Sequence, residues 1–291
     1  MENPMFSLII GTLNRPNAIR SCLTSIFNQK YSNYEIVIID QSDDDKTSKL
    51  VSGISDNRIK YEHVSFKGLS KARNLALKKA SGQFFCLMDD DAYYDENYLL
   101  EAVQHLQSKR ILSGYIYDTV KKKEFVGYSH IYNKRNVTLR MIMRTCPSAG
   151  LVIPMQLIKD VGMFDEDFGV GARYGSGEET DLLLRAIRNN YKVMYFESMV
   201  LEHPVPLPSI VENEEIKSRK RASYFMGLGA LYKKHMINFN MKVLYLAYFE
   251  NLLKFYIKML IYSGARKDYA QKQYEAFVNG YNSYEGTKKL L

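Results

Sequence analysis

The 291-residue sequence contains no tryptophan and only three cysteines. Its aromatic residues are 23 tyrosines and 14 phenylalanines, and a tyrosine-rich surface often contacts rings, sugars or a membrane interface. Cys22, Cys86 and Cys146 are odd in number, far apart and set among apolar residues. This excludes a disulfide framework and a zinc site, so we expect reduced core thiols and a cytoplasmic location.

Long apolar runs are also absent. No stretch of 18 uncharged apolar residues is present, and the opening MENPMFSLII lacks the basic start of a signal peptide. We therefore expect neither a bilayer-spanning helix nor a secretion signal. Apolar residues still make up 46% of the chain, which is enough for the core of one large α/β domain, with or without an appendage.

Positive charge is concentrated in the C-terminal part. Residues 209–291 contain 14 Lys and Arg against 7 Asp and Glu, whereas residues 1–208 contain 26 against 25. This asymmetry favours an acidic partner for the C-terminal part, with a solvated helical face as the alternative. Nucleic acid is not the expected partner, because no recognised binding module accompanies the charge.

Short apolar runs alternate with segments of helical periodicity over the first 110 residues. The runs at 6–12, 35–40 and 84–88 are typical of strands buried on both faces. Helical spacing follows 16–27, where Pro16 suits a first turn and Asn14 a cap, and recurs in 68–82. This order predicts an α/β fold with a mostly parallel sheet flanked by helices.

Polar residues follow three of these predicted strands. Thr12 and Asn14, Asp40, and the triplet 89–91 lie at or just past strand ends, where open sheets of this kind bind ligands. Carboxylates at such an edge suit Mg²⁺ or Mn²⁺, and residues i and i+2 of an extended chain point to the same side. Asp89 and Asp91 would then share a metal, and Asp90 would point towards a ribose hydroxyl. The alternative is a solvated acidic turn.

Five motifs in this order resemble those of inverting glycosyltransferases of family two, which have the GT-A fold. They are FSLIIGTLNRP, EIVIIDQSDD, GLSKARNLAL, GQFFCLMDDDA and GSGEETDLLLRAIRNNYKVMYFE. The resemblance covers about the first 205 residues. It implies a catalytic domain over 1–208, with a nucleotide-binding half to about 110 and an acceptor-binding half over 111–208, and leaves 209–291 as a basic helical extension.

The same resemblance implies a reaction and its ligands. The donor would be a nucleotide-diphosphate sugar, with UDP favoured, and the cofactor Mn²⁺ or Mg²⁺. The acceptor would be a hydroxyl of a saccharide or lipid-linked saccharide, in cell-surface polysaccharide synthesis. The alternatives are a sugar-nucleotide nucleotidyltransferase and a non-catalytic membrane-associated scaffold of the same fold.

Carried over by position, the resemblance gives most of the candidate residues a role. Asp89 and Asp91 match the outer residues of the family's DxD motif and would bind the metal, with His203 as a third ligand. The residues implied in donor binding are Thr12, Asn14, Arg15, Asp40, Arg73, Asp89 and Asp90. Of these, Asp40 matches the residue that reads the uracil edge in uridine-dependent members, and Arg73 matches an arginine that contacts the base or a phosphate. The segments PSAGLVIP and GMFDEDFG match the acceptor side of the family, which implies contacts from Gly150, Asp165 and Glu166.

Inversion needs a general base opposite the leaving diphosphate, to take the proton of the acceptor hydroxyl. In the family this carboxylate lies in an acidic pair at the start of a helix, and here the pair is Glu178 and Glu179. Glu179 replaces the usual aspartate by position, and Glu178 is the substitute. The alternative is that acidic residues in a first turn only favour the helix dipole.

The segment 240–267 is apolar, aromatic and interspersed with lysines. One helical face could lie in a membrane interface while Lys and Arg contact anionic headgroups, which would place the protein on the inner face of the cell membrane. The alternative is a helix that packs on the catalytic domain or forms a homodimer.

Overall fold

The computed structural model describes residues 5–124, 136–143, 149–204, 214–238 and 241–286. The chain divides into two compact units, of which the first consists of Met1–Phe164 and Leu182–Leu207 and the second of Asp165–Asp181 and Pro208–Leu291. The second unit therefore combines the C-terminal region with 165–181, a segment that the sequence placed in the acceptor-binding half. Cys146 lies outside the described residues.

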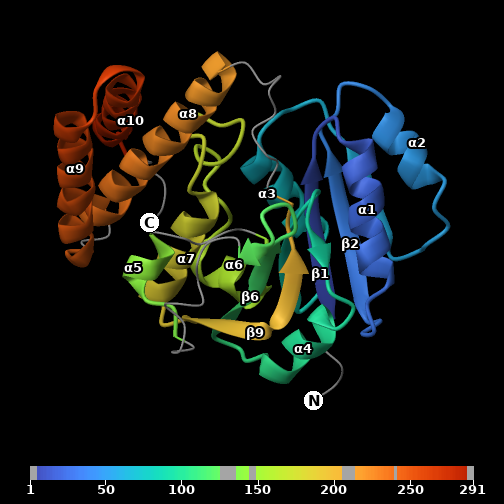
Figure 1. Cartoon of the computed structure of the whole chain (residues 1–291). Coiled ribbons are helices and arrows are strands. Elements are labelled where there is room, and N and C mark those ends of the chain that lie inside the picture. Colours follow the sequence, from blue (N-terminus) through green and yellow to red (C-terminus); the bar gives the residue numbers. More distant parts are fainter. Residues whose placement is uncertain (1–4, 125–135, 144–148, 205–213, 239–240, 287–291) are drawn as a thin grey trace. The chain divides into compact units, whose positions relative to one another are not determined.

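The first unit is built on one mixed sheet (Figure 1). In the described part of the chain its strand order is β3-β2-β1-β4-β8-β6-β9-β5, with β7 paired to β6. The strands are β1 (Phe6–Thr12), β2 (Tyr34–Asp40), β3 (Ile59–His63), β4 (Phe84–Asp89), β5 (Tyr93–Tyr94), β6 (Arg110–Asp118), β7 (Lys123–Glu124), β8 (Leu151–Pro154) and β9 (Lys192–Glu202).

Helices connect these strands and make up most of the second unit. In the first unit they are α1 (Pro16–Phe27), α2 (Lys46–Ser52), α3 (Leu69–Lys79), α4 (Tyr98–His105), α5 (Leu139–Ile142) and α6 (Gln156–Val161). Helix α7 (Glu178–Arg188) begins in the second unit and continues into the first. The second unit also contains α8 (Glu214–Lys233), the π-helix η1 (Lys234–Asn238), α9 (Val243–Ile261) and α10 (Gly264–Ser283).

The N-terminal half of the sheet has the predicted parallel pairing. Strand β1 pairs in parallel with both β2 and β4, and β2 with β3. Antiparallel strands enter at β8, which lies between β4 and β6. The predicted α/β class with a C-terminal helical region is thus confirmed. Strand β3 and helix α2 were not predicted from the sequence.

Both faces of β1 are covered, because its side chains alternate between two layers of helices. Phe6, Leu8 and Ile10 belong to one core cluster with Ile19 and Leu23 of α1. Helix α3 covers the other face, and Figure 1 shows α1 and α3 on opposite sides of the strands. This two-sided burial explains why β1 reads as a continuous apolar run.

Helix α1 begins differently from the prediction. Pro16 is its first residue, as expected, but the N-cap is Arg15 and no side chain caps the helix. Asn14 instead has a positive φ of 57°. The prediction of an asparagine cap was therefore wrong. The reason is that the Asn14 side chain is engaged by the loop after β2, with which it forms two hydrogen bonds.

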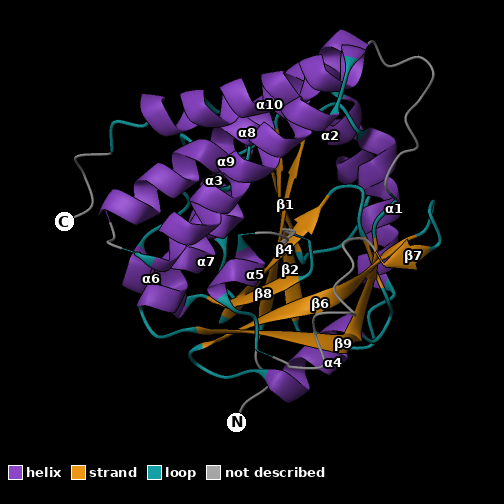
Figure 2. Ribbon diagram, turned by 60° about the vertical axis from the view of Figure 1, so that its left-hand side comes forward, coloured by secondary structure: helices purple, strands orange, loops and turns teal. Residues whose placement is uncertain are grey.

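Helices α8, α9 and α10 of the second unit lie side by side (Figure 2). Glycines allow α8 and α10 to approach closely. A Cβ atom at Gly229 of α8 would lie 1.9 Å from the carbonyl oxygen of Phe277, and one at Gly280 of α10 would lie 1.9 Å from that of Met226. Any larger residue at these two positions would push the helices apart. None of the helices that the structure describes is sufficiently long and apolar to cross a membrane.

A buried carboxylate joins the amino ends of the strands. Glu35 of β2 accepts hydrogen bonds from Ser7 Oγ at 2.6 Å and from the Ser81 backbone N–H at 2.5 Å, and its other oxygen lies 2.6 Å from Lys60 Nζ. Burial alone would raise the pKa of Glu35, but the bonds from Lys60, Ser7 and Ser81 outweigh it and lower the pKa from 4.5 to about 2. The ionised form therefore stabilises the fold above the unfolded-state pKa, and this contribution is lost as the pH falls towards 2.

We predict that Glu35→Gln lowers the free energy of unfolding at pH 7 by about 1–3 kcal/mol, because a charged acceptor with several donors is lost. The difference from wild type should shrink as the pH is lowered from about 4.5 towards 2. Urea unfolding at pH 7, 5, 4 and 3 measures this. Glu62→Gln is the control, because it removes a half-exposed partner of Lys79. An equal loss for Glu35→Gln at pH 7 and pH 3 would contradict the assignment.

Candidate functional site

The carboxyl ends of β1, β2 and β4 bring the predicted polar residues to one edge of the sheet. In the parallel ladders Thr12 lies opposite Asp40, and Gly11 lies opposite Asp89. The residues that follow β4 complete the group. The convergence predicted from three separate strand ends is therefore present in the structure.

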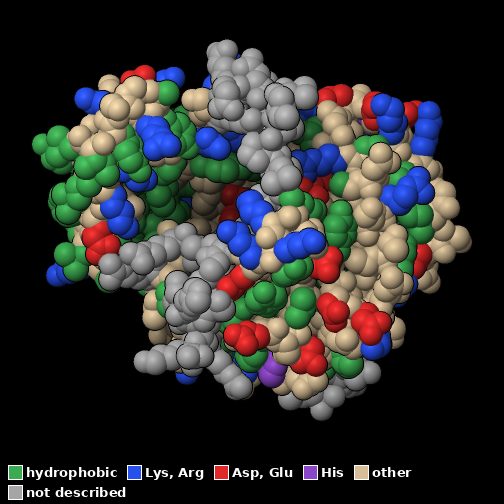
Figure 3. Space-filling model, viewed as in Figure 1, with side chains coloured by type: hydrophobic (Ala, Val, Ile, Leu, Met, Phe, Trp, Pro, Cys, Tyr) green, Lys and Arg blue, Asp and Glu red, His purple; other side chains and the backbone are tan. Residues whose placement is uncertain are grey.

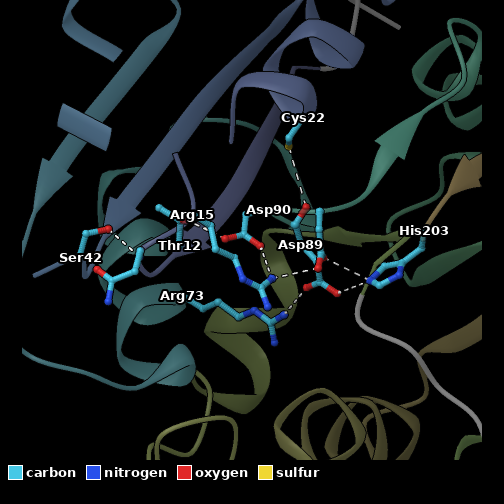
Figure 4. A network of polar contacts seen from close by, with 10 residues as sticks. Thr12, Arg15, Cys22, Ser42, Arg73, Asp89, Asp90 and His203 are labelled. Carbon is cyan, nitrogen blue, oxygen red and sulfur yellow. Dashed lines mark hydrogen bonds and ion pairs between the residues drawn. The ribbon is translucent and has the colours of Figure 1, made fainter. Parts of the chain in front are cut away.

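Arg15 and Thr12 bind the second and third aspartates of the triplet (Figure 4). Arg15 Nη1 lies 3.0 Å from Asp90 Oδ1 and 2.9 Å from Asp91 Oδ2. Thr12 Oγ1 donates a hydrogen bond of 2.7 Å to the other oxygen of Asp90, which is 6% exposed. Burial raises the pKa of Asp90, although Thr12 and Arg15 act against that rise. Asp90 therefore ties the start of the loop after β1 to the end of β4.

Arg73 faces the first aspartate from helix α3. Its guanidinium is almost fully buried, lies 3.4 Å from Asp89 Oδ1 and is 5.7 Å from the centre of the Phe164 ring. Asn74, the next residue, exchanges two hydrogen bonds of 2.9 Å with the backbone of Phe164. The predicted Arg73 thus lies at the predicted edge, held there by an aromatic ring and a neighbouring amide.

His203 approaches the same carboxylates from the end of β9. Its Nε2 atom lies 3.8 Å from Asp89 Oδ2 and 3.4 Å from Asp91 Oδ1, and its backbone N–H donates to the Tyr117 carbonyl. One oxygen of each outer aspartate therefore faces the imidazole, while Asp91 Oδ2 and Asp89 Oδ1 face Arg15 and Arg73. The separation of Asp89 and Asp91 by two residues does bring both to one point.

Two carboxylates and an imidazole that face one another are a donor set that fits Mn²⁺ or Mg²⁺. Among the residues that the structure describes, no three His, Cys, Asp or Glu side chains are already spaced as a metal site. In this structure the two arginines lie against the aspartates. The three carboxylates exceed the two guanidinium groups by one negative charge, so the cluster still favours a cation.

The loops after β1 and β2 are bound to each other by Asn14. Its side chain donates to Asp43 Oδ2 and accepts from the Asp43 backbone N–H, both at 2.8 Å, and its own N–H donates to Ser42 Oγ at 2.8 Å. Lys67 adds a 2.6 Å contact to Asp43 and a hydrogen bond to the Gln41 carbonyl. Asn14 is therefore at the edge of the site and shapes this loop pair.

Asp40 is fully buried beneath these loops. Its Oδ1 accepts from the Ser42 backbone N–H at 2.9 Å, and its Oδ2 accepts from the Tyr61 hydroxyl at 2.7 Å. Burial and the bond to Asp40 both raise the pKa of Tyr61 above its usual value, so the phenol remains a donor. The structure thus gives Asp40 a role in fixing the loop, and its contact with a base remains a prediction.

Sequence reasoning missed Tyr61 and Lys67. Tyr61 lies on β3, which is a half-buried strand at the edge of the sheet, and Lys67 follows that strand. The alternation of apolar and polar residues in IKYEH was the available signal, and it is too short to stand out.

Close packing and a positive φ explain why position 150 is a glycine. It has a positive φ of 84°, and a Cβ atom there would lie 2.3 Å from Leu201 Cδ2. Its carbonyl accepts from the Tyr98 hydroxyl at 2.8 Å and from the Gly114 N–H at 2.9 Å. Its predicted contact with an acceptor stays a prediction.

The second unit contains the remaining predicted residues. Glu178 and Glu179 open helix α7, directly after Gly177, whose φ is 99°. Glu178 is 4% exposed and Glu179 is half-buried. Asp165 lies 2.7 Å from Lys234 Nζ, while the Glu166 side chain is exposed. The acidic pair thus begins a helix, as predicted.

More than half of the chain matches the sequence profile of a known family. The sequence profile described as "Glycosyl transferase family 2" matches residues 7–160 of this chain. This region includes β1, β2 and β4 and all of the polar residues at their carboxyl ends. It ends before His203 and the acidic pair of α7.

A similar sequence belongs to the Escherichia coli protein named UDP-Glc:alpha-D-GlcNAc-diphosphoundecaprenol beta-1,3-glucosyltransferase WfgD. It is 28% identical over 148 residues, which cover 50% of this chain and 58% of WfgD. The chain spans less than two thirds of the length of the first curated relatives that it matches.

Two solved structures have a similar fold over 96% of this chain. Staphylococcus aureus TarS 1–349 in complex with UDP-GlcNAc has a TM-score of 0.57 and 20% identity, with 91% of it covered. The mannosyltransferase PcManGT of Pyrobaculum calidifontis, in complex with GDP-Man and Mn²⁺, has a TM-score of 0.59 and 16% identity, with 72% covered. At these identities the likeness establishes the fold, which is the predicted GT-A type.

Proposed function

Because the chain belongs to glycosyl transferase family 2, we propose that it is an inverting enzyme that transfers a sugar from a nucleotide-diphosphate sugar to a hydroxyl group. The acceptor is a saccharide or a lipid-linked saccharide, and the pathway is the synthesis of a cell-surface polysaccharide. The observation that carries the proposal is the convergence of Thr12, Arg15, Arg73, the three aspartates and His203 at one sheet edge.

The donor is a UDP-sugar. The likeness of Asp40 to the uracil-reading residue of uridine-dependent members, with Arg73 as a base- or phosphate-contacting arginine, supports this choice, and TarS was solved with UDP-GlcNAc. PcManGT, which was solved with GDP-Man, shows that the fold also accepts another base. Asp40 keeps the loop after β2 in place through Ser42 and Tyr61, so the base would lie against a preformed surface.

Asp89, Asp91 and His203 would hold the metal. A bound Mn²⁺ or Mg²⁺ supplies positive charge to the diphosphate as it leaves. When the donor binds, Arg15 and Arg73 would exchange their present carboxylate partners for oxygens of the diphosphate. The guanidinium group favours phosphate for the same bidentate geometry that it uses with carboxylates.

Glu179 is the general base. Its carboxylate takes the proton of the acceptor hydroxyl while the hydroxyl oxygen attacks the anomeric carbon, and the bond to the diphosphate breaks on the opposite face. The configuration at that carbon is therefore inverted. Glu178 is less suited, because it is almost fully buried.

Helix α9 supports association with an anionic membrane. It has two apolar faces: Leu244 and Phe255 are buried, and a second face is exposed. The five most exposed side chains of that second face are Leu246 (72%), Ile261 (68%), Leu260 (66%), Phe249 (60%) and Leu253 (58%). Figure 3 shows hydrophobic side chains gathered over the C-terminal helices, with basic residues among them.

The positive charge near the exposed apolar face of α9 favours an anionic lipid surface as its partner. In the sequence of α9 and its flanks, residues 242–268, the basic residues are Lys242, Lys254, Lys258, Arg266 and Lys267, and the acidic residues are Glu250 and Asp268. An apolar stripe bordered by lysines is typical of helices that lie in the interface of a bilayer with anionic lipids. A second copy of the chain would carry the same positive charge and is the less favourable partner.

We predict that Mn²⁺ together with UDP raises the melting temperature, and that Asp89→Asn and Asp91→Asn abolish this rise. The substitutions remove the carboxylates that would hold the ion against the diphosphate. A thermal-shift series of UDP, GDP, CDP and dTDP, with Mn²⁺ or EDTA, measures it. Asp45→Asn is the control, since Asp45 is exposed and paired with Lys49. An unchanged UDP shift in EDTA would contradict the metal site.

We predict that Glu179→Gln lowers the rate of sugar transfer by about 10²–10⁴-fold, the contribution of a general base, and leaves the UDP thermal shift unchanged. Release of UDP from UDP-Glc or UDP-GlcNAc, with water as the acceptor, provides the assay. Glu178→Gln tests the neighbouring carboxylate, and Glu275→Gln on α10 is the control. A wild-type rate in Glu179→Gln would show that Glu179 is not the base.

We predict that the chain sediments with vesicles of phosphatidylglycerol and phosphatidylcholine, and that replacing both Phe249 and Leu253 by Glu reduces the bound fraction about tenfold or more, because two large apolar side chains no longer enter the interface. Both side chains are exposed, so the fold should survive. Gln271→Glu on α10 is the control. Retention of vesicle binding in the double variant would contradict the proposal, as would a dimer in analytical ultracentrifugation that this variant dissociates.

A further inference from the structure

The second unit buries a lysine between two carboxylates. Lys234 is 1% exposed, and its Nζ atom lies 2.7 Å from both Asp165 Oδ2 and Asp181 Oδ1. The same oxygen of Asp181 lies 2.8 Å from His235 Nε2. The Lys234 ammonium is also 5.2 Å from the centre of the Phe168 ring. All five residues belong to the second unit.

Burial makes this a strong constraint. Asp181 and His235 are fully buried, and the Asp165 side chain is 11% exposed. A buried charge without a partner costs several kcal/mol, so Lys234 cannot leave one carboxylate without a large penalty. The ammonium group thus fixes the distance between Asp165 in the loop after α6 and Asp181 in α7.

The two segments are those that carry the predicted acceptor residues and the predicted base. Asp165 precedes Glu166 in the loop after α6, and Asp181 is the fourth residue of α7, two positions after Glu179. The Asp181 N–H donates to the Gly177 carbonyl at 2.8 Å, which joins this aspartate to the turn from which the acidic pair starts. Any movement of Asp181 therefore moves Glu179.

The clamp, which is Lys234 bound to both Asp165 and Asp181, comes from the C-terminal region. Lys234 and His235 are the first residues of η1, where α8 changes from α-helical to π-helical hydrogen bonding. Such π-helical turns are uncommon and frequent at functional sites. Here the wider turn presents Lys234 and its neighbour His235 to the same carboxylate.

We propose that Lys234 is a positioning residue for sugar transfer, which holds the start of α7, and with it the base, at a fixed distance from the acceptor loop at Asp165. This inference rests on the proposed function and gives the C-terminal region a part in it. A reacting group misplaced by about 1 Å can lower a rate by about 10²-fold, so loss of the clamp should slow transfer without affecting donor binding.

The test measures UDP release in Lys234→Met and Asp165→Asn, from whichever of UDP-Glc and UDP-GlcNAc the wild-type protein cleaves faster with water as the acceptor. We expect kcat to fall about 10- to 100-fold with the donor KM unchanged. Lys234→Arg, which keeps a charge able to reach both carboxylates, should recover most of the rate. Lys233→Met is the matched control, because the adjacent lysine is only half-buried and lies over the Tyr281 ring.

Combination with Glu179→Gln separates positioning from general destabilisation. If Lys234 acts through the base, Lys234→Met should cause little further loss in that background, whereas a merely structural effect would multiply with it. Asp165→Asn, which is nearly isosteric, decides the question if Lys234→Met fails to fold. Wild-type rates in folded Asp165→Asn or Lys234→Met would overturn the inference. So would a double variant in which the rate losses of Lys234→Met and Glu179→Gln multiply in full. An inactive wild-type protein would instead count against the proposed function.

Discussion

The concentration of negative charge at the end of β4 is the constraint on which the first unit depends. Three successive carboxylates repel one another, and one of them, Asp90, is buried. The fold meets this with Arg15 from the start of α1 and Arg73 from α3, two cations from helices on opposite faces of the sheet. Because two guanidinium groups leave one negative charge, the arrangement suits a further cation, and the proposed exchange of partners from carboxylates to phosphates would follow from the same charge balance.

The same principle acts in the opposite sense in the second unit, where one buried cation is held by two carboxylates. Buried ionic groups are weak evidence of stability, since apolar replacements are often as stable. Their value lies in geometry: an ammonium group that needs both Asp165 and Asp181 permits only one arrangement of the segments that carry them. Each unit thus uses charge to fix the residues that its predicted chemistry requires.

The sequence was informative where function depends on local pattern and silent where it depends on distant contacts. Apolar runs that end in polar residues predicted the edge formed by Thr12, Asp40 and Asp89, because parallel strands align their carboxyl ends. Tyr61 escaped notice because β3 is short and half-buried. The pairing of Lys234 with Asp165 spans 69 residues and leaves no periodic trace. Asn14 was misread as a cap because its partner, Asp43, lies on another loop.

Because Lys234 and His235 belong to η1, the C-terminal region takes part in the buried cluster around Asp165 and Asp181. A helical appendage whose only task was to bind a membrane would need one apolar face outward and one against its neighbour, as α9 has. It would not need to send a lysine and a histidine into a buried cluster with Asp165 and Asp181. Removing the region would leave both of these aspartates without the cations that neutralise them. The segment 165–181 and the C-terminal helices are therefore parts of one folding unit, in which η1 contacts Asp165 and Asp181 and α9 carries the exposed apolar surface.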